Sequence, residues 1–218
     1  MFIVGVTGGI GSGKSTAAKL IGSWGIPVFD ADKISHEVTE AGGKAIPRVA
    51  EAFGPEVLLD DGSLDREAMG RVVFNDRKEL DRLSLIVHEE VMGRLAELSA
   101  ESDKAGEKAV VLDVPIPVEK GFRDTCDYIL VVRCDEEIRL ERLANRGMDR
   151  QEARRRMAMQ MTDEEYSALA TETINNNGTI EELEEALRRT IGEALEMRGI
   201  RIPEQSDPKE EETQSESV

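Results

Sequence analysis

The chain is poor in aromatic residues, cysteine and histidine. Aromatic residues make up 4% of its 218 residues, which is too few for the stacking platforms that bind single-stranded nucleic acids. The two cysteines, Cys126 and Cys134, form no C-x-x-C pair and have no histidine cluster at metal spacing. We therefore predict two reduced, buried thiols rather than a disulfide framework or a metal site.

Long apolar runs and excess positive charge are also missing. No apolar run approaches ~18 residues, so no segment is expected to span a membrane. The net charge of −17 offers no basic footprint for a nucleic-acid partner. An apolar strand begins at residue 2 and leaves no room for a signal peptide, so we expect a cytoplasmic protein. Residues 203–218, with six acidic residues and one lysine, are expected to form a disordered acidic tail.

A glycine-rich octapeptide near the start is the strongest motif. Residues 8–15, GGIGSGKS, match the phosphate-binding loop (P-loop) G-x-x-x-x-G-K-[ST], between a predicted strand, Phe2–Val6, and a predicted helix, Ser15–Trp24. Backbone N–H groups of such a loop surround phosphate oxygens, Lys14 adds a cation, and the Ser15 hydroxyl can bind Mg²⁺. We predict a nucleoside triphosphate site. Its residues are Gly9, Ile10, Gly11, Ser12, Gly13, Lys14, Ser15 and Thr16.

Apolar strands alternate with helical patterns along the rest of the chain. Further strands are predicted at 27–29, 109–114, 128–133 and 173–175, which indicates an α/β fold with a parallel sheet, the three-layer α/β/α P-loop NTPase architecture. Segments 1–32, 107–134 and 172–200 would form the nucleotide-binding core. The long helical stretch 33–106 reads as an inserted lobe for the phosphate acceptor, and 135–171 as a lid region.

Acidic residues follow two of the predicted strands. Asp30 and Asp32 come after the strand at 27–29, and Asp113 ends the apolar run 110–113. Ligands of open α/β sheets bind at the carboxyl ends of the strands, where a carboxylate can accept a proton from a hydroxyl or lie near Mg²⁺. Two alternatives stay open: Asp30 and Asp32 as helix caps, and Asp113 as an ordinary loop residue.

The predicted lid carries four arginines at spacings of three and four residues. They are Arg139, Arg142, Arg146 and Arg150. If the helix were continuous they would share one face, although Gly147 is expected to break it. Guanidinium groups on a lid can stabilise the charge of a transferring phosphoryl group. The alternative is a solvated face on which arginines pair with neighbouring glutamates, namely Glu136, Glu137 and Glu141.

Both histidines, His36 and His88, lie outside any metal-binding pattern. His36 falls one helical turn after Asp32 and could therefore face an acceptor. A structural role is the alternative for each of them.

Five segments, in this order, resemble the dephospho-coenzyme A kinases over about residues 2–195. They are Val6-Thr7-Gly8 through Ser15; Asp30-Ala31-Asp32 with His36; Asp61-Gly62-Ser63-Leu64-Asp65-Arg66 with Val73-Phe74; Val111-Leu112-Asp113-Val114-Pro115; and Asn176-Asn177-Gly178. The chain departs from the family at Glu89, where the family usually has proline, and at residues 116–119.

The resemblance implies that ATP, with Mg²⁺, phosphorylates the ribose 3′-hydroxyl of dephospho-coenzyme A. It implies Asp32 as general base, Lys14 and Arg142 as phosphoryl stabilisers, and Ser15 as the Mg²⁺ ligand. The strand-end pattern already places Asp113 near the same metal. Asn176 and Gly178 would lie near the adenine. The implied acceptor-side residues are Thr7, Asp30, Asp32, His36, Asp65, Arg66, Phe74, His88, Asp113 and Pro115. We expect a monomer or weak homo-oligomer.

Three other functions fit parts of the sequence. Another small-molecule P-loop kinase would keep the P-loop and lid, but the D-G-x-L-D-R match disfavours it. A GTP-dependent switch should carry N-K-x-D, which the sequence lacks. An inactive scaffold is disfavoured by the intact Lys14, Ser15, Asp32 and Asp113.

Overall fold

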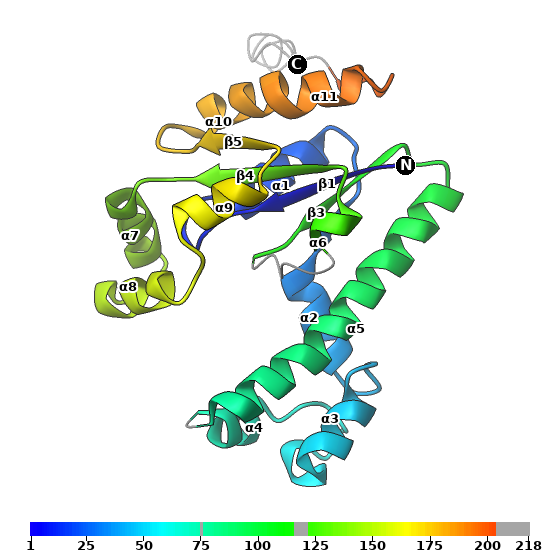
Figure 1. Ribbon diagram of the computed structural model, residues 1–218, viewed down its shortest axis with the longest axis vertical. Coiled ribbons are helices and arrows are strands. Elements are labelled where there is room, and N and C mark those ends of the chain that lie inside the picture. Colours follow the sequence, from blue (N-terminus) through cyan, green and yellow to red (C-terminus); the bar gives the residue numbers. More distant parts are fainter. Residues whose placement is uncertain (75, 116–121, 204–218) are drawn as a thin grey trace, which may run out of the picture.

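A five-stranded, wholly parallel sheet forms the centre of the computed structural model, which describes residues 1–74, 76–115 and 122–203 (Figure 1). Its order is β2-β3-β1-β4-β5. The strands are β1 (Phe2–Thr7), β2 (Val28–Asp30), β3 (Ala109–Asp113), β4 (Tyr128–Arg133) and β5 (Glu172–Asn175). All five predicted strands are confirmed. The departure at residues 116–119 and the predicted tail from residue 204 lie outside the described residues.

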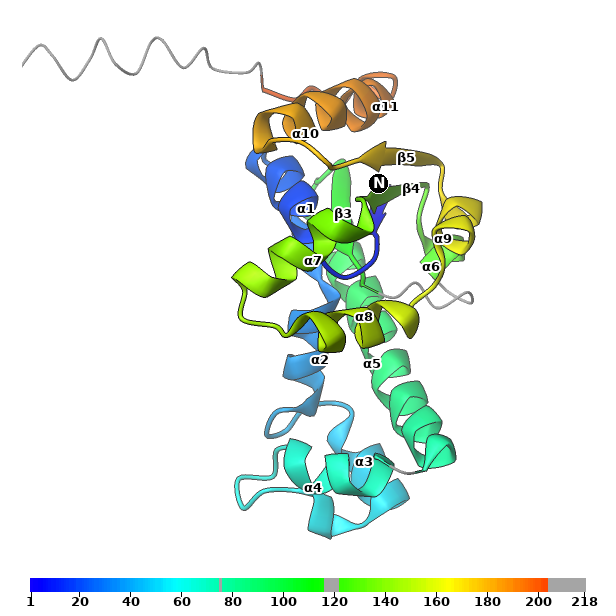
Figure 2. The ribbon, with the colours of Figure 1, turned by 90° about the vertical axis from the view of Figure 1, so that its left-hand side faces the viewer.

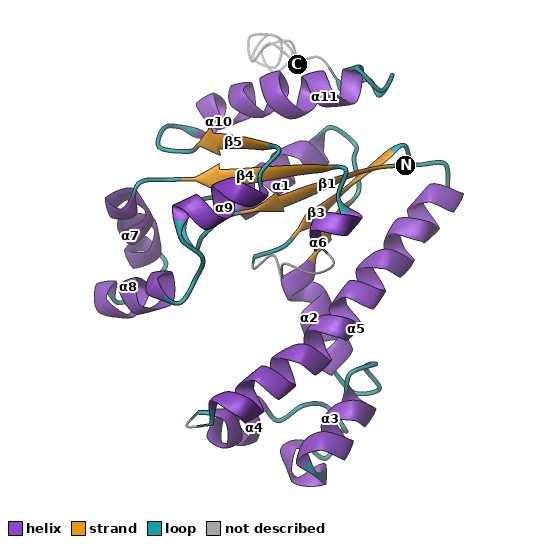
Figure 3. Cartoon of the chain, in the orientation of Figure 1, coloured by secondary structure: helices purple, strands orange, loops and turns teal. Residues whose placement is uncertain are grey.

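Helices cover both faces of the sheet (Figure 3). On one face lie α1 (Lys14–Ser23), α10 (Ile180–Leu187), a π-helical turn (Arg188–Gly192) and α11 (Glu193–Glu196), packed on alternate strand residues such as Val111. The other face receives the intervening residues, such as Val110, and is covered by α2 (Ala31–Thr39), α5 (Arg77–Lys104), α6 (Phe122–Thr125) and α9 (Asp163–Leu169). This alternation follows from side chains pointing to opposite faces of a strand. The predicted three-layer α/β/α fold is confirmed.

A helical lobe separates β2 from β3 in the chain and extends away from the sheet (Figure 2). It contains α2 (Ala31–Thr39), α3 (Ile46–Phe53), a 3₁₀ turn (Pro55–Val57), α4 (Arg66–Val73) and α5 (Arg77–Lys104). The prediction of a mainly helical stretch here is confirmed. The helical pattern of the sequence predicts a helix over residues 35–40. Helix α2 begins instead at Ala31, because the Asp30 side chain caps it directly at the end of β2.

The lid region contains α7 (Glu136–Asn145) and α8 (Arg150–Ala158), followed by α9. The chain turns at Gly147 with φ +83°, so the predicted break between the arginines is confirmed. The helical pattern of the sequence predicts a second helix over about residues 149–161, but α8 ends at Ala158, and α9 was not predicted. Its signal was in the sequence, since Thr162 and Glu165 form a capping box. Short α6 was also missed.

Within residues 1–74, 76–115 and 122–203, none of the helices is long and apolar enough to cross a membrane.

Candidate active site

The P-loop connects the end of β1 to the start of α1 and needs glycine where the chain is most crowded. Gly13 has φ +97°, and a Cβ there would lie 2.1 Å from Asn176 Nδ2. A Cβ on Gly8 would lie 2.3 Å from the Val132 carbonyl oxygen. Only glycine therefore allows the backbone to pack this closely while its N–H groups turn toward a ligand.

A cavity of about 280 Å³ lies over this loop. Seven of the eight P-loop residues predicted to bind the nucleotide line it, and the eighth, Ser12, is buried. The cavity is completed by Gly8, Asp32, Pro115, Arg146 and Gln160. The loop, the acid after β2, the end of β3 and the lid thus meet around one space.

Lys14 forms an ion pair with Asp113 at the floor of this site. The distance from Lys14 Nζ to Asp113 Oδ1 is 2.7 Å, and the two side chains are 12% and 3% exposed. Lys14 Nζ also donates to Ser15 Oγ at 3.3 Å. Strand pairing produces this cluster, since Asp113 lies opposite Val6 of β1 and Asp30 of β2. Cation and carboxylate therefore hold each other beside the cavity.

The two aspartates after β2 have different roles. Asp30 Oδ1 accepts hydrogen bonds from the backbone N–H groups of Asp32 and Lys33, at 2.9 and 3.2 Å, and so caps α2. Asp32 is free of such a role and borders both the P-loop cavity and a second, larger one. The helix-cap alternative therefore describes Asp30, whereas Asp32 faces the space between two cavities.

The environment of Asp32 favours its neutral form. Desolvation by the surrounding walls raises the pKa of Asp32 above its usual range, and the carboxylates of Asp30 and Asp113 add to this rise. The charge of Lys14, and more weakly that of His36, opposes it. A carboxylate with a raised pKa is a stronger base, which suits proton acceptance from a hydroxyl.

The second cavity, of about 650 Å³, lies between α2 and α5 and ends at Val114 and Pro115. Most of its wall is apolar, from Leu64 to Leu95. The polar residues on it are Asp32, Ser35, Thr39, Arg66, Asp81, Ser84 and His88. Burial lowers the pKa of His88, with Glu89 opposing, so the ring is neutral at neutral pH. This is a site for a mainly apolar ligand with a few polar groups.

Other predicted acceptor residues surround Arg66 or lie away from the cavity. Arg66 Nη2 lies 3.1 Å from His36 Nδ1 and donates to Thr39 Oγ1 at 3.0 Å. Asp65 caps α4 by accepting from two backbone N–H groups. Phe74 is 84% exposed. Arg66 thus lines the cavity directly, whereas His36, Asp65 and Phe74 do not.

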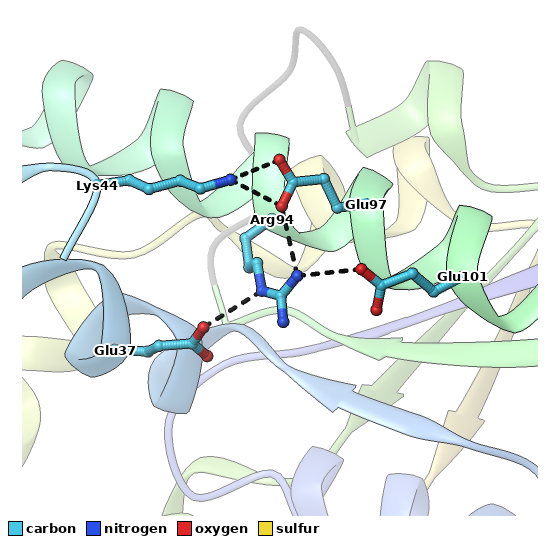
Figure 4. Close-up of polar contacts among 5 residues, drawn as sticks. All are labelled: Glu37, Lys44, Arg94, Glu97 and Glu101. Carbon is cyan, nitrogen blue, oxygen red and sulfur yellow. Dashed lines mark hydrogen bonds and ion pairs between the residues drawn. The ribbon is translucent and has the colours of Figure 1, made fainter.

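Exposed ion pairs tie the two helices of this cavity together (Figure 4). Arg94 of α5 reaches Glu37 of α2 at 3.2 Å and Glu97 and Glu101 of its own helix at 3.3 and 3.5 Å. Lys44, after α2, pairs with Glu97 at 2.6 Å. We call these five residues the α2–α5 network, because their ion pairs connect the two helices.

The four lid arginines divide between the P-loop and solvent. Arg139 Nε donates to the Ile10 carbonyl at 2.8 Å, and Arg142 Nη1 lies 3.4 Å from both the Ser12 carbonyl and Cys134 Sγ. Arg146 lines the P-loop cavity. Arg150 pairs with Glu137 at the surface. The solvated alternative therefore describes Arg150, while the other three lie at the loop.

Three further predicted residues support the site rather than line its cavities. Asn176 is buried and its Nδ2 donates to the Ser12 carbonyl at 2.8 Å. Gly178 makes room for the Glu182 side chain that caps α10, since a Cβ there would lie 1.6 Å from a carboxylate oxygen. Thr7 is fully buried, and its hydroxyl has no partner among the described residues.

Several residues of the site belong to no motif that could be recognised in the sequence. Gln160 Oε1 accepts the Ile10 N–H at 2.7 Å across 150 positions of the chain. Asp81 and Ser84 line the second cavity from α5. Arg139 was assigned to the lid without a role at Ile10. Such contacts depend on tertiary packing, which no local pattern of residues encodes.

The features described so far define a P-loop kinase. They are a parallel sheet, a P-loop after β1, an acid at the end of β3, arginines of the predicted lid at the loop, and a second cavity that shares Asp32 with the first. The family model "Dephospho-CoA kinase" matches residues 2–182. A dephospho-CoA kinase of Corynebacterium glutamicum is 39% identical over 194 residues, covering 88% of this chain and all of that protein. One of Streptomyces avermitilis is 43% identical over 185 residues, 84% of this chain and 89% of that protein.

Solved structures agree. A crystal structure of a Thermus thermophilus protein is 37% identical with a TM-score of 0.72, covering 88% of this chain and 97% of that one. The dephospho-CoA kinase from Campylobacter jejuni, 24% identical, covers 90% of this chain and 98% of its own with a TM-score of 0.67, which supports the fold. The chain belongs to the dephospho-CoA kinase family. It is an enzyme that uses a nucleotide, as the resemblance predicted.

Proposed function

We propose that this enzyme transfers the γ-phosphoryl group of ATP to the ribose 3′-hydroxyl of dephospho-coenzyme A, giving coenzyme A and ADP. The single observation that carries the proposal is the position of Asp32, on the wall of both the P-loop cavity and the apolar acceptor cavity. Family membership supports the identity of the acceptor.

In this reaction Asp32 accepts the proton of the attacking hydroxyl. Its raised pKa makes it a better base than an ordinary aspartate. Lys14 and Arg142, with Arg146 beside the cavity, stabilise charge that spreads over the phosphoryl oxygens. Since the acceptor cavity is mostly apolar, it suits the pantetheine arm, with Arg66 and His88 as polar contacts.

The donor set at the P-loop fits Mg²⁺. Ser15 Oγ and the Asp113 carboxylate are hard oxygen donors. Within the described residues, no group of three or more His, Cys, Asp or Glu could hold a metal ion by itself, so the remaining ligands would come from the substrate and water. Mg²⁺ commonly binds through one or two protein oxygens together with substrate phosphates. When bound, it would neutralise phosphate charge, and Ser15 with Asp113 would hold it.

The wider assignments belong to the same proposal. Segments 1–32, 107–134 and 172–200 act as nucleotide core, 33–106 as acceptor lobe and 135–171 as lid. Dependence on ATP favours a cytoplasmic location, the acidic charge disfavours nucleic-acid partners, and we expect a monomer or weak homo-oligomer.

The test is a phosphoryl-transfer assay with ATP, Mg²⁺ and dephospho-coenzyme A, with AMP, adenosine and no acceptor in parallel. NMR reads the position of the new phosphate. A 3′-phosphorylated product from dephospho-coenzyme A alone is expected. If the enzyme turned over only with another acceptor, it would still be a P-loop kinase, but the assignment of dephospho-coenzyme A as the acceptor would be wrong.

A further inference from the structure

Ile10, in the middle of the P-loop, is held by the lid at three points. Its backbone N–H donates to Gln160 Oε1 at 2.7 Å, and its carbonyl accepts from Arg139 Nε at 2.8 Å. Its side chain packs on the small apolar cluster of the lid, around Leu140 and Leu143. One residue of the phosphate-binding loop is therefore the joint between loop and lid.

Gln160 occupies a short linker that is fixed at both ends. Its own N–H donates to the Met157 carbonyl at the end of α8, at 3.1 Å. Two residues later, Thr162 begins the capping box of α9. The linker between these two helix ends gives the half-buried Gln160 side chain little freedom. That side chain lines the P-loop cavity together with Lys14 and Asp32.

A neutral amide suits this position. A carboxylate could also accept the Ile10 N–H, but its charge would repel the phosphates that the loop binds. An apolar side chain of equal length would leave the N–H without its partner. Glutamine thus fastens lid to loop without a charge in the phosphate cavity.

The geometry points to Gln160 as a positioning residue for phosphoryl transfer, acting through Ile10. Its hydrogen bond sets how the lid docks on the P-loop, and the lid carries Arg142 and Arg146 to the site. This inference rests on the proposed function for its kinetic test. The hydrogen bond between Gln160 and Ile10 can be tested separately, because it does not depend on the identity of the phosphate acceptor.

Gln160→Met is the direct test because methionine keeps the length and removes the acceptor. We expect kcat to fall about tenfold, the loss that corresponds to ~1.4 kcal/mol in the barrier. The KM for dephospho-coenzyme A should stay within about twofold, since Gln160 does not line the acceptor cavity. The melting temperature should be unchanged. Met159→Ala, at an exposed neighbour in the same linker, is the matched control and should retain wild-type kinetics.

Amide hydrogen exchange at Ile10 gives a second readout that needs no turnover. Exchange should accelerate in Gln160→Met and stay slow in Met159→Ala. It should also stay slow in Gln160→Glu, which retains an acceptor oxygen but, by its charge, should raise the KM for ATP.

Three results would overturn the inference. Unchanged exchange at Ile10 in Gln160→Met would mean that the bond does not hold the loop. Faster exchange with unchanged kcat would mean that the bond does not position the reaction. A lowered melting temperature with both KM values raised would mean a merely structural role. If the wild-type enzyme did not use dephospho-coenzyme A, the proposed function would be wrong instead. The comparison of hydrogen exchange at Ile10 would still show whether Gln160 holds the loop.

Discussion

The P-loop side and the acceptor lobe are held in shape by different forces. At the P-loop, the Lys14–Asp113 pair is buried, and Asn176 and Arg139 donate to the loop's own carbonyl groups. In the lobe, the α2–α5 network is exposed, and the cavity wall beyond it is mostly apolar. Buried pairs are costly to break, whereas exposed pairs contribute little and are screened by salt. Breaking a pair should therefore cost more stability at the donor site than in the lobe.

The largest effect on activity is expected at Asp32, which lines both the P-loop cavity and the second cavity. Asp32→Asn should lower kcat by roughly 10²–10⁴-fold, the usual contribution of a positioned base. Steady-state transfer assays measure it. Glu37→Gln, which changes an exposed carboxylate on the same helix, is the control and should lose little. Equal losses in both variants would contradict a special role for Asp32.

Asp32→Asn should not lower stability at neutral pH. The raised pKa means that the folded protein binds a proton at Asp32 more tightly than the unfolded chain does. The ionised carboxylate therefore costs stability above its folded pKa, and this cost vanishes as the pH falls below the ordinary value of an aspartate. Urea unfolding at neutral pH checks this, and a clear loss of stability would mean that the charge is stabilising.

The second effect tests how rigid the donor side is. Asp113→Asn should destabilise the fold by about 3 kcal/mol, because it leaves the Lys14 ammonium buried without its counter-charge. Urea unfolding measures it. The double variant Lys14→Met with Asp113→Leu should recover much of the stability and remain inactive. If Asp113→Asn alone were neutral, the pair would not be what holds the start of α1 against the end of β3.

A smaller effect is expected on the pH dependence of kcat/KM. Since protonated Asp32 cannot accept the substrate proton, kcat/KM should fall on acidification at a pH above the usual aspartate range. Asp30→Asn removes a charge that raises the pKa of Asp32, so the acid limb should move to lower pH. Asparagine still caps α2. Glu37→Gln should leave the limb in place; an unmoved limb in Asp30→Asn would assign it to another group.

The sequence predicted the donor side better than the acceptor side, for a physical reason. The P-loop and the acids at strand ends are local patterns, and the parallel sheet brings strand ends together without further information. The same holds for the capping role of Asp30, which its spacing to Asp32 and Lys33 already allowed. What the sequence signals locally is backbone geometry, so residues that act through the backbone were foreseeable.

Side-chain direction and long-range contacts were not foreseeable. Phe74 fits its motif but lies 84% exposed, because the motif does not fix which way the end of α4 faces. Gln160 reaches Ile10 only through the packing of α8 on α7 and of α9 on β4. Asp81 and Ser84 become cavity residues only once α5 is placed beside α2.

The smallest effect is expected in the lobe, at the α2–α5 network. Arg94→Ala removes the centre of the α2–α5 network and should cost only ~0.5–1 kcal/mol of stability at low salt, and less at high salt, because its partners are exposed. Since the network braces the helices that form the acceptor cavity, the KM for dephospho-coenzyme A should rise about two- to threefold with the KM for ATP unchanged. Arg71→Ala, which breaks a single exposed pair on α4, is the control. A large, salt-independent loss in Arg94→Ala would mean that the lobe is as rigidly built as the P-loop, and the contrast between the two regions would fail.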